Sequence, residues 1–344
     1  MKKSEISLLN VLFCMMVIFI HVTSAALTGV GDAAFIVLYT LQRFCGVAVY
    51  GFIFLSGVKL FLKDCSAVSY GKYITSRIMR IYVPYLIATV LYYFFEIWRG
   101  YYIFDIKQLI HFVITGKGEC HLYFVVIIMQ FYLLRPLWNM LLNSRRNATC
   151  LVVTALVNVL CVYKLPQLLG AIGIRDFAYN DRVFTSYVFF WFAGCVFGRY
   201  YERFVAVFKK ILPVMIVLLV ITLWADVLLS VRGRLYGIYY PCMDVVHLAY
   251  VAVAVFALYS ASLIPQATEV CKLHIFRAIN SVTFQMYLFH ICVVAIVGDF
   301  LNKYSSLGHL DRWAIALPSV YIISISLCII YNKLKNQLER NKLN

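Results

Sequence analysis

Long apolar runs separated by short polar and charged segments repeat along the whole chain. The runs are about 20 residues long, which is the length that a helix needs to cross the roughly 30 Å hydrocarbon core of a bilayer, and they do not alternate as barrel strands do. They cover residues 8–28, 38–62, 79–97, 122–142, 148–163, 183–198, 211–229, 244–263, 281–299 and 313–331. The pattern predicts an all-α, polytopic integral membrane protein with about ten transmembrane helices.

Composition agrees with a chain that folds in lipid. Hydrophobic residues make up 63% of the 344 residues and charged residues only 13%, and the mean hydropathy is +0.85. Soluble domains average about 25% charged residues. A soluble fold of this chain would expose large apolar patches, whereas a bilayer accepts helices whose backbone groups are bonded internally.

The number of cysteines suggests a disulfide or metal framework, and the N-terminus suggests a cleaved signal peptide, but the apolar runs argue against both. The chain has 11 cysteines but no CxxC pair, and most of them lie in apolar runs. We interpret them as small buried hydrophobic residues and expect no metal site. Met1-Lys2-Lys3 before an apolar run resembles a signal peptide, but the run over 8–28 is long enough to span, so we expect it to stay uncleaved.

The distribution of charge predicts the orientation. If the N-terminus is cytoplasmic, the inner segments hold 19 Lys and Arg against five Asp and Glu, a net charge of +14, and the outer segments hold ten of each sign. The positive-inside rule favours this arrangement over the inverted one. Ten spans then leave both termini in the cytoplasm. The excess cations face anionic lipid, so the basic pI of about 9.3 does not require nucleic acid as a partner.

The chain shows no division into domains. We find no internal repeat and no low-complexity linker, and we predict a single domain over residues 1–344. The predicted outer loops lie at about 98–121, 164–182 and 230–243, and they are long enough to cover an outer cavity.

Two ionisable residues in the first two spans are the leading candidates for a functional site. An ionisable group in a span costs about 2.5–3.5 kcal/mol on insertion scales, so function is the default hypothesis. His21 suits proton transfer near neutral pH, and Arg43 suits an oxyanion or an anionic substrate. Because the two helices run in opposite directions, we expect both residues at similar depth in the outer half. The alternatives are a structural histidine and an arginine that snorkels to the interface.

Weaker candidates lie toward the cytoplasm. Arg77 and Arg80, three residues apart at the entry to the third span, suit the phosphates of a nucleotide-like donor, and the alternative is an ordinary basic flank. Asn10 lies three helical turns below His21 on nearly the same face. Arg135, before Pro136 in the fourth span, is a further case.

Other candidates lie at mid-membrane and at the outer side. His121 and Tyr123 begin the fourth span, where an aromatic belt is the alternative. Thr283, Tyr287 and His290 share one face of the ninth span, where an interhelical hydrogen-bonded cluster is the alternative. Together with the inner arginine pair, this distribution suits a donor from the cytoplasm and an acceptor from the outer face.

Five short segments follow one another on the predicted helices. They are Leu9-Asn10-Val11 through Ile20-His21; Arg43 followed by Phe52-Ile53-Phe54-Leu55-Ser56-Gly57; Arg77-Ile78-Met79-Arg80 with Pro84; His121-Leu122-Tyr123-Phe124 with Phe131, Tyr132 and Pro136; and Tyr287-Leu288-Phe289-His290. In this order they resemble the acyltransferase 3 family of membrane-bound bacterial acyltransferases, across nearly the full chain. The departures are Asn10 where the family often has a basic residue, Tyr123 where it has tryptophan, and Val125 where leucine is common.

The resemblance implies O-acylation of cell-surface carbohydrate in the bacterial cytoplasmic membrane. An acyl-CoA, expected to be acetyl-CoA, gives up its acyl group on the cytoplasmic side, and a hydroxyl of capsule, lipopolysaccharide or another surface glycan receives it. The implied roles are catalytic for His21 and Arg43, acyl-CoA-binding for Arg77, Arg80 and Asn10, and acceptor-binding for His121, Tyr123, Tyr287 and His290.

Two other classes of protein would show the same spans and buried polar residues. One is a transporter or flippase of glycans or other solutes, although no repeat relates two halves and no pair of spans is broken by Gly and Pro. The other is a purely structural subunit of a polysaccharide-export complex. Acyl transfer that depends on His21 separates the enzyme from both.

Overall fold

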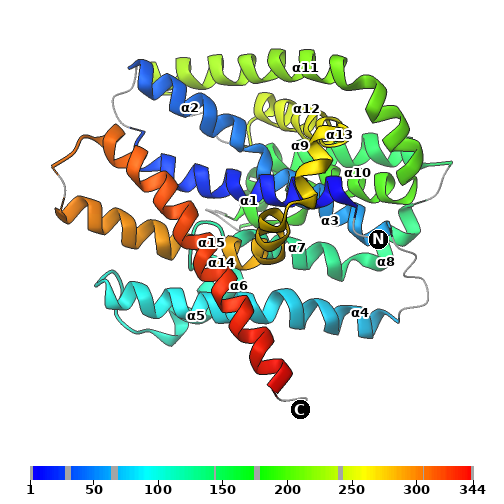
Figure 1. Ribbon diagram of the computed structural model, residues 1–344. Coiled ribbons are helices and arrows are strands. Elements are labelled where there is room, and N and C mark those ends of the chain that lie inside the picture. The colour runs from blue at the N-terminus through cyan, green and yellow to red at the C-terminus, as the bar shows by residue number, and fades with distance from the viewer. Residues whose placement is uncertain are drawn as a thin grey trace. The chain divides into compact units, whose positions relative to one another are not determined.

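The computed structural model describes residues 3–27, 32–62, 69–142, 145–173, 179–238, 243–304 and 306–341, and within these ranges it is helical with no strand (Figure 1). The elements are α1 (Ser4–Ser24), α2 (Ala33–Cys45), α3 (Val47–Phe61), α4 (Tyr70–Arg77), η1 (Ile78–Tyr82), α5 (Val83–Trp98), α6 (Ile106–Thr115), α7 (Tyr123–Leu133), α8 (Arg135–Leu141), α9 (Asn147–Ala171), η2 (Asn180–Arg182), η3 (Phe184–Tyr187), α10 (Val188–Arg199), α11 (Tyr201–Leu235), α12 (Val245–Ser262), α13 (Pro265–Glu269), η4 (Val270–Lys272), α14 (His274–Tyr304) and α15 (His309–Asn341).

The predicted fold class is confirmed, with a difference in the number of long spans. Among the described residues, eight helices are long and apolar enough to cross a membrane, or nine if the bent pair α7 and α8 forms one span. These coincide with nine of the ten predicted runs. The exception is the run over 183–198, where the structure has the 12-residue helix α10 after the four-residue 3₁₀ helix η3. Together these two elements rise about 26 Å, close to one bilayer core.

A second difference lies in the predicted outer loop over 98–121, which contains the short apolar helix α6. Asp105 caps its N-terminus by accepting a hydrogen bond from the Lys107 backbone N–H at 2.8 Å. Gly116 ends it with φ of 68°, a left-handed conformation that favours glycine.

The bend between α7 and α8 has a local cause. Pro136 has no N–H to continue the α7 ladder, and the two helices meet at 58°. The indole N–H of Trp138 donates to the Phe131 carbonyl oxygen at 2.8 Å in the last turn of α7. A side chain beyond the break therefore satisfies a backbone acceptor before it.

The chain separates into two compact units, and each is described by itself. Unit 1 comprises Met1–Gly51 and Val205–Asn344, and unit 2 comprises Phe52–Phe204, so the boundaries fall within α3 and near the start of α11. That residues 1–344 form a single domain stays a prediction.

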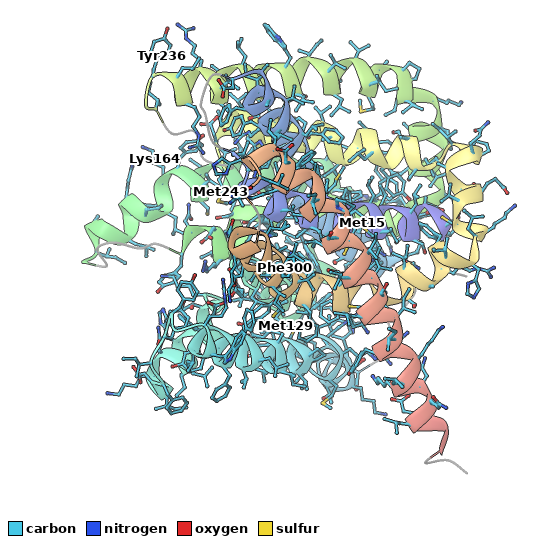
Figure 2. All side chains as sticks on the ribbon, turned by 60° about the vertical axis from the view of Figure 1, so that its left-hand side comes forward. Met15, Met129, Lys164, Tyr236, Met243 and Phe300 are labelled. Carbon is cyan, nitrogen blue, oxygen red and sulfur yellow. The ribbon has the colours of Figure 1, made fainter. Side chains whose placement is uncertain are left out.

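Unit 1 is built around α1, which packs against α2, α12, α14 and α15 (Figure 1). The Tyr321 hydroxyl of α15 donates to the Met15 carbonyl oxygen at 2.9 Å, and Figure 2 shows Met15 beside α15. The Phe13 ring lies over Gly51, where an added Cβ would come within 2.3 Å of it. Only 11% of the most apolar stretch of α11 is buried, as expected of a helix that faces lipid.

Unit 2 holds α10 against α3 by backbone contact. A Cβ added to Gly194 would lie 2.1 Å from the Phe54 carbonyl oxygen, and one added to Gly198 would lie 2.4 Å from the Val58 carbonyl oxygen. Small residues permit this approach, which is the usual way for helices to associate tightly in lipid. Beside α10, the rings of Phe131 and Trp191 stack at 4.5 Å.

Candidate active site

Two histidines meet in unit 1. His21 of α1 and His290 of α14 have ring centroids 5.2 Å apart, and the Tyr287 ring lies 6.2 Å from His290. The His290 Nδ1 is 2.8 Å from the Tyr287 carbonyl oxygen and 3.1 Å from that of Met286. Because carbonyl oxygens only accept, Nδ1 carries the proton, and Nε2 of the neutral ring is the acceptor. The structure thus brings His21 of the first predicted span together with Tyr287 and His290, which were predicted on one face of the ninth.

Helices α1 and α2 meet at the level of His21 and Arg43. The Gln42 side-chain amide donates to the Ile20 carbonyl oxygen at 3.3 Å and to the Ser24 hydroxyl at 2.9 Å. Gln42 and Ile20 are the chain neighbours of Arg43 and His21. This contact agrees with the similar depth that the sequence predicted for the two ionisable residues.

Arg43 belongs to a buried network with Asp226 and His247. The Arg43 Nε donates to Asp226 Oδ2 at 2.9 Å, and its Nη2 donates to Asp226 Oδ1. The His247 Nδ1 lies 3.0 Å from the same Oδ2. The exposed fractions of Arg43, Asp226 and His247 are 4%, 2% and 0%. Three helices, α2, α11 and α12, therefore contribute one ionisable residue each to a single cluster.

Asp226 and His247 are not among the residues predicted from the sequence, although both are ionisable residues within predicted spans. Asp226 falls in the predicted span 211–229 and His247 in the predicted span 244–263. An ionisable residue in a span is a functional candidate. Asp226 is one of the ten acids that the charge pattern assigns to the outer segments, whereas the structure buries it inside α11.

The junction between α2 and α3 packs against His247 of this network. Gly46 ends α2, and a Cβ added there would lie 2.9 Å from both Cε1 and Nε2 of His247. The Tyr250 hydroxyl donates to the Phe44 carbonyl oxygen at 2.6 Å, which ties α12 to the last turn of α2. A side chain at position 46 would thus push the imidazole away from Asp226.

Asn10 is not brought to His21. Both lie on the single helix α1, 11 residues and about 16 Å apart. Asn10 is half-buried, near the end of α1 that the charge pattern places in the cytoplasm.

In unit 2, the predicted arginine pair lies on an irregular helix. Arg77 ends α4, and Arg80 lies in the π-helical turn η1. The Val83 N–H bonds to the Ile78 carbonyl oxygen, five residues back, just before Pro84, which cannot donate at all. Such π turns often occur at functional sites. Arg77 is half-buried and Arg80 is exposed.

Arg77 rests on aromatic rings. Its guanidinium carbon lies 5.1 Å from the Tyr73 ring centroid and 4.7 Å from that of Tyr132. Arg135 of α8 lies 4.4 Å from the same Tyr73 ring. Within the described part of unit 2, no carboxylate pairs with Arg77. Two guanidinium groups around one tyrosine form a basic, aromatic surface that suits an anion.

His121 and Tyr123 flank the start of α7. His121 is buried with its ring 5.7 Å from that of Tyr92, and the Arg182 guanidinium carbon lies 5.7 Å from the Tyr123 ring centroid. Nearby, burial and the Glu96 carboxylate raise the pKa of Glu119 to about 7. This acid therefore titrates near neutral pH in the loop that leads into α7.

A family model described as an acyltransferase domain, of the acyltransferase 3 type, matches residues 3–333. The chain belongs to this acyltransferase family. It is thus a multi-pass membrane protein of the acyltransferase 3 family, and the resemblance carried by its five segments is confirmed.

Curated relatives of this acyltransferase-family chain come from Staphylococcus aureus. The proteins of strains MSSA476 and MW2, each named "Probable poly-beta-1,6-N-acetyl-D-glucosamine export protein", are 26% identical over 170 residues. The match covers 46% of this chain and 46% of each relative, so the chain spans about half the length of the curated relatives it matches. No solved structure matches the chain significantly.

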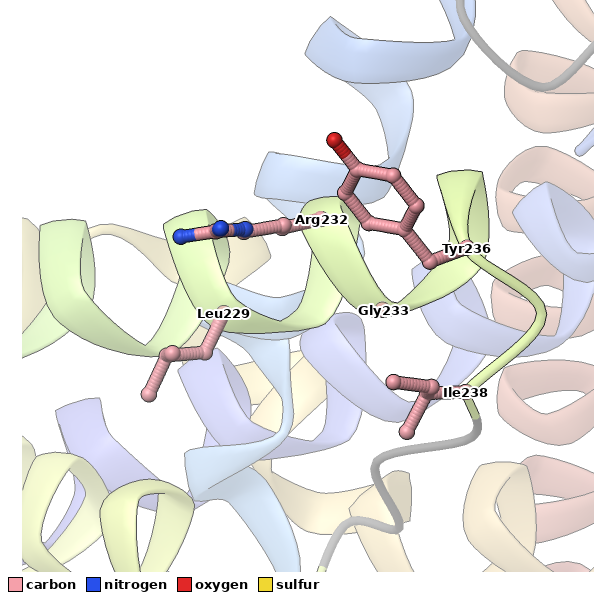
Figure 3. A pocket seen from close by; sticks show the side chains of 5 residues that line it. All are labelled: Leu229, Arg232, Gly233, Tyr236 and Ile238. Atoms are coloured by element: carbon pink, nitrogen blue, oxygen red, sulfur yellow. The ribbon is translucent and has the colours of Figure 1, made fainter.

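A surface pocket lies at the end of α11, in unit 1 (Figure 3). It has a volume of about 430 Å³ and is lined by Leu229, Arg232, Gly233, Tyr236 and Ile238. Gly233 lies seven residues beyond Asp226 on the same face of the helix, about 10 Å away. Gly233 of the pocket thus shares one face of α11 with Asp226 of the buried network. Among the described residues, no three His, Cys, Asp or Glu gather as a metal site would require.

Proposed function

We propose that this protein is a transmembrane O-acyltransferase of the bacterial cytoplasmic membrane, which moves an acyl group, most simply acetyl, from cytoplasmic acyl-CoA to a hydroxyl of a cell-surface or lipid-linked polysaccharide. The observation that carries the proposal is the contact of His21 with His290 inside the apolar helices of an acyltransferase-family chain. A hydroxyl is a poor nucleophile, and imidazole is the side chain best suited to remove its proton near pH 7.

The reaction forms one bond and breaks another. The acceptor hydroxyl oxygen attacks the thioester carbonyl carbon, the new C–O bond forms, and the C–S bond to coenzyme A breaks. His21 takes the hydroxyl proton and returns it to the departing thiolate, so that ester and free coenzyme A thiol are the products. His290 and Tyr287 support this imidazole and face the acceptor.

The remaining residues divide between donor and acceptor. In this proposal, Arg43 donates hydrogen bonds to the oxygen that gains negative charge in the transition state. Arg77 and Arg80 bind the phosphates of coenzyme A, with Asn10 on the same cytoplasmic side. His121 and Tyr123 contact the acceptor, since aromatic rings stack on sugars and their polar atoms bond to hydroxyl groups.

A glycan acceptor is supported by the curated relatives, whose names refer to export of poly-beta-1,6-N-acetyl-D-glucosamine. The same names support a second candidate function, in which the chain moves a polysaccharide across the membrane without modifying it. Ionisable residues within spans are common to transporters and transferases. The two functions differ in whether a labelled acyl group appears in the glycan.

Inside-out vesicles that contain the protein test both functions. Labelled acetyl-CoA is supplied outside the vesicles, which is the former cytoplasmic side, and label in the glycan is measured. We expect His21→Ala to lower transfer by at least about 100-fold, the usual contribution of a general base. His274→Ala, at an exposed position in the first turn of α14, is the matched control and should transfer normally.

Equal transfer by the wild-type and His21→Ala proteins would contradict the proposed role of His21. Glycan that crosses the membrane without acquiring label would support the exporter instead. If the protein neither transports glycan nor transfers an acyl group, the results would favour a purely structural subunit.

A further inference from the structure

In the network of Arg43, Asp226 and His247, the positive charge of Arg43 is paired with the negative charge of Asp226. Asp226 accepts a hydrogen bond from Arg43 Nε on Oδ2 and another from Arg43 Nη2 on Oδ1. His247 Nδ1 lies 3.0 Å from the same Oδ2. Such a two-point pair fixes both the position and the plane of a guanidinium group. The three side chains have at most 4% exposure, so water does not screen the pairing.

We propose that Asp226 and His247 are positioning residues, which neutralise Arg43 and fix its guanidinium as a hydrogen-bond donor to an uncharged acyl or hydroxyl oxygen rather than as a counter-ion for an anionic substrate group. The inference rests on the proposed function for the nature of the reaction. It goes beyond that function because it limits the substrate groups that the site accepts.

Charge compensation is the physical reason. An anionic group next to Arg43 would be attracted by the guanidinium and repelled by the Asp226 carboxylate on the other side of it, so the net attraction is much weaker than an unpaired arginine would provide. A thioester carbonyl is neutral in the ground state and gains charge only as the bond forms. It therefore benefits from an oriented N–H donor without needing a net positive charge.

His247 orients the carboxylate that orients Arg43. Its Nδ1 faces Asp226, and its Nε2 and Cε1 lie against the Gly46 backbone, where no Cβ fits. Gly46→Ala would displace the imidazole without removing any ionisable group. This substitution therefore tests geometry separately from charge.

Donor selectivity is the first measurement. The donors are acetyl-CoA and succinyl-CoA, whose acyl group carries a carboxylate. We expect Asp226→Asn to lower kcat with acetyl-CoA by about 10- to 100-fold, as a misplaced catalytic group does, and to raise the succinyl-to-acetyl ratio of kcat/KM about tenfold, because Arg43 is then uncompensated. Asp311→Asn, on the exposed first turn of α15, is the control and should change neither value.

Gly46→Ala should lower kcat with little change in the donor ratio, since the charges remain. Most of its effect should vanish in a His247→Ala background. A loss of the same size in both backgrounds would show that Gly46 does not act through His247.

Thermal unfolding in detergent tests the pairing without any activity. Asp226→Ala leaves a gap of carboxylate size beside Arg43, and formate should raise the melting temperature of this variant. Formate should have no such effect on Asp226→Ala combined with Arg43→Gln. Formate that stabilises both variants alike, or neither, would overturn the inference.

The acyltransferase function and the positioning role of Asp226 can fail separately. If the wild-type protein transfers no acyl group, the proposed function fails, while the formate measurement still decides whether Asp226 compensates Arg43. If transfer occurs and Asp226→Asn leaves the donor ratio unchanged, or if the wild-type protein prefers succinyl-CoA, the inference fails and the proposed function stands.

Discussion

Ionisable side chains in apolar surroundings behave according to their partners. Arg43 alone in a span would attract any anion, but its guanidinium donates two hydrogen bonds to the Asp226 carboxylate, so that the pair as a whole carries no net charge. Arg77 has aromatic rings and no carboxylate among the described residues around it, so its positive charge stays available. The same residue type thus has different partners in the two units.

The role of Arg77 leads to a prediction about donor affinity. We expect Arg77→Gln to raise KM for acetyl-CoA by about 10- to 100-fold, because a hydrogen bond to a charged group contributes roughly 1.5–3 kcal/mol. KM for acetyl-pantetheine, which lacks the nucleotide phosphates, should not change. Steady-state kinetics with both donors check this, and an equal rise for both would show that Arg77 does not contact phosphate.

Glu119 leads to a prediction about pH. Burial and Glu96 raise its pKa from 4.5 to about 7, so the folded state binds a proton more tightly than the unfolded state does. Stability should therefore fall as pH rises from about 4.5 to about 7, and the cost should be complete above pH 7. Glu119→Gln should flatten this part of the melting-temperature profile and should be more stable than the wild-type protein at pH 8.

At the scale of elements, proline and glycine residues decide where helices bend and how closely they pack. Pro84 follows the π turn that carries Arg80, and Pro136 follows the break that separates α7 from α8. Gly194 and Gly198 let α10 approach the α3 backbone directly. A 12-residue helix can therefore hold its place through close contact instead of length.

This packing predicts the effect of one methyl group. Gly194→Ala should lower the free energy of unfolding by about 1–3 kcal/mol, since its Cβ would overlap a backbone oxygen that cannot rotate away. Gly170→Ala in α9 is the matched control, because nothing lies within 4 Å of its added Cβ. Thermal unfolding in detergent would measure both, and equal stability of the two variants would contradict the close approach.

At the scale of the whole molecule, the charge pattern predicts that both termini lie in the cytoplasm, and this arrangement needs an even number of crossings. The nine long spans among the described residues would alone put the termini on opposite sides, so η3 and α10 must also cross if both ends are cytoplasmic. Reporter fusions test this. We expect an alkaline phosphatase reporter to be active after residue 182 and inactive after residue 203 and at the C-terminus. Equal activity after residues 182 and 203 would show that α10 does not cross.

The sequence by itself determined that the chain folds in a lipid bilayer, its fold class, its family and most of the candidate residues. The length of the apolar runs, the charge asymmetry and the short ordered motifs that indicate them are all local properties of the sequence. It predicted His21, Tyr287 and His290 without showing that they touch, since the contact joins α1 to α14 across more than 260 residues. Only the tertiary structure decided that Arg43 is paired. Its partners come from two later helices, and the neutralising contact depends on how α2, α11 and α12 pack around Gly46.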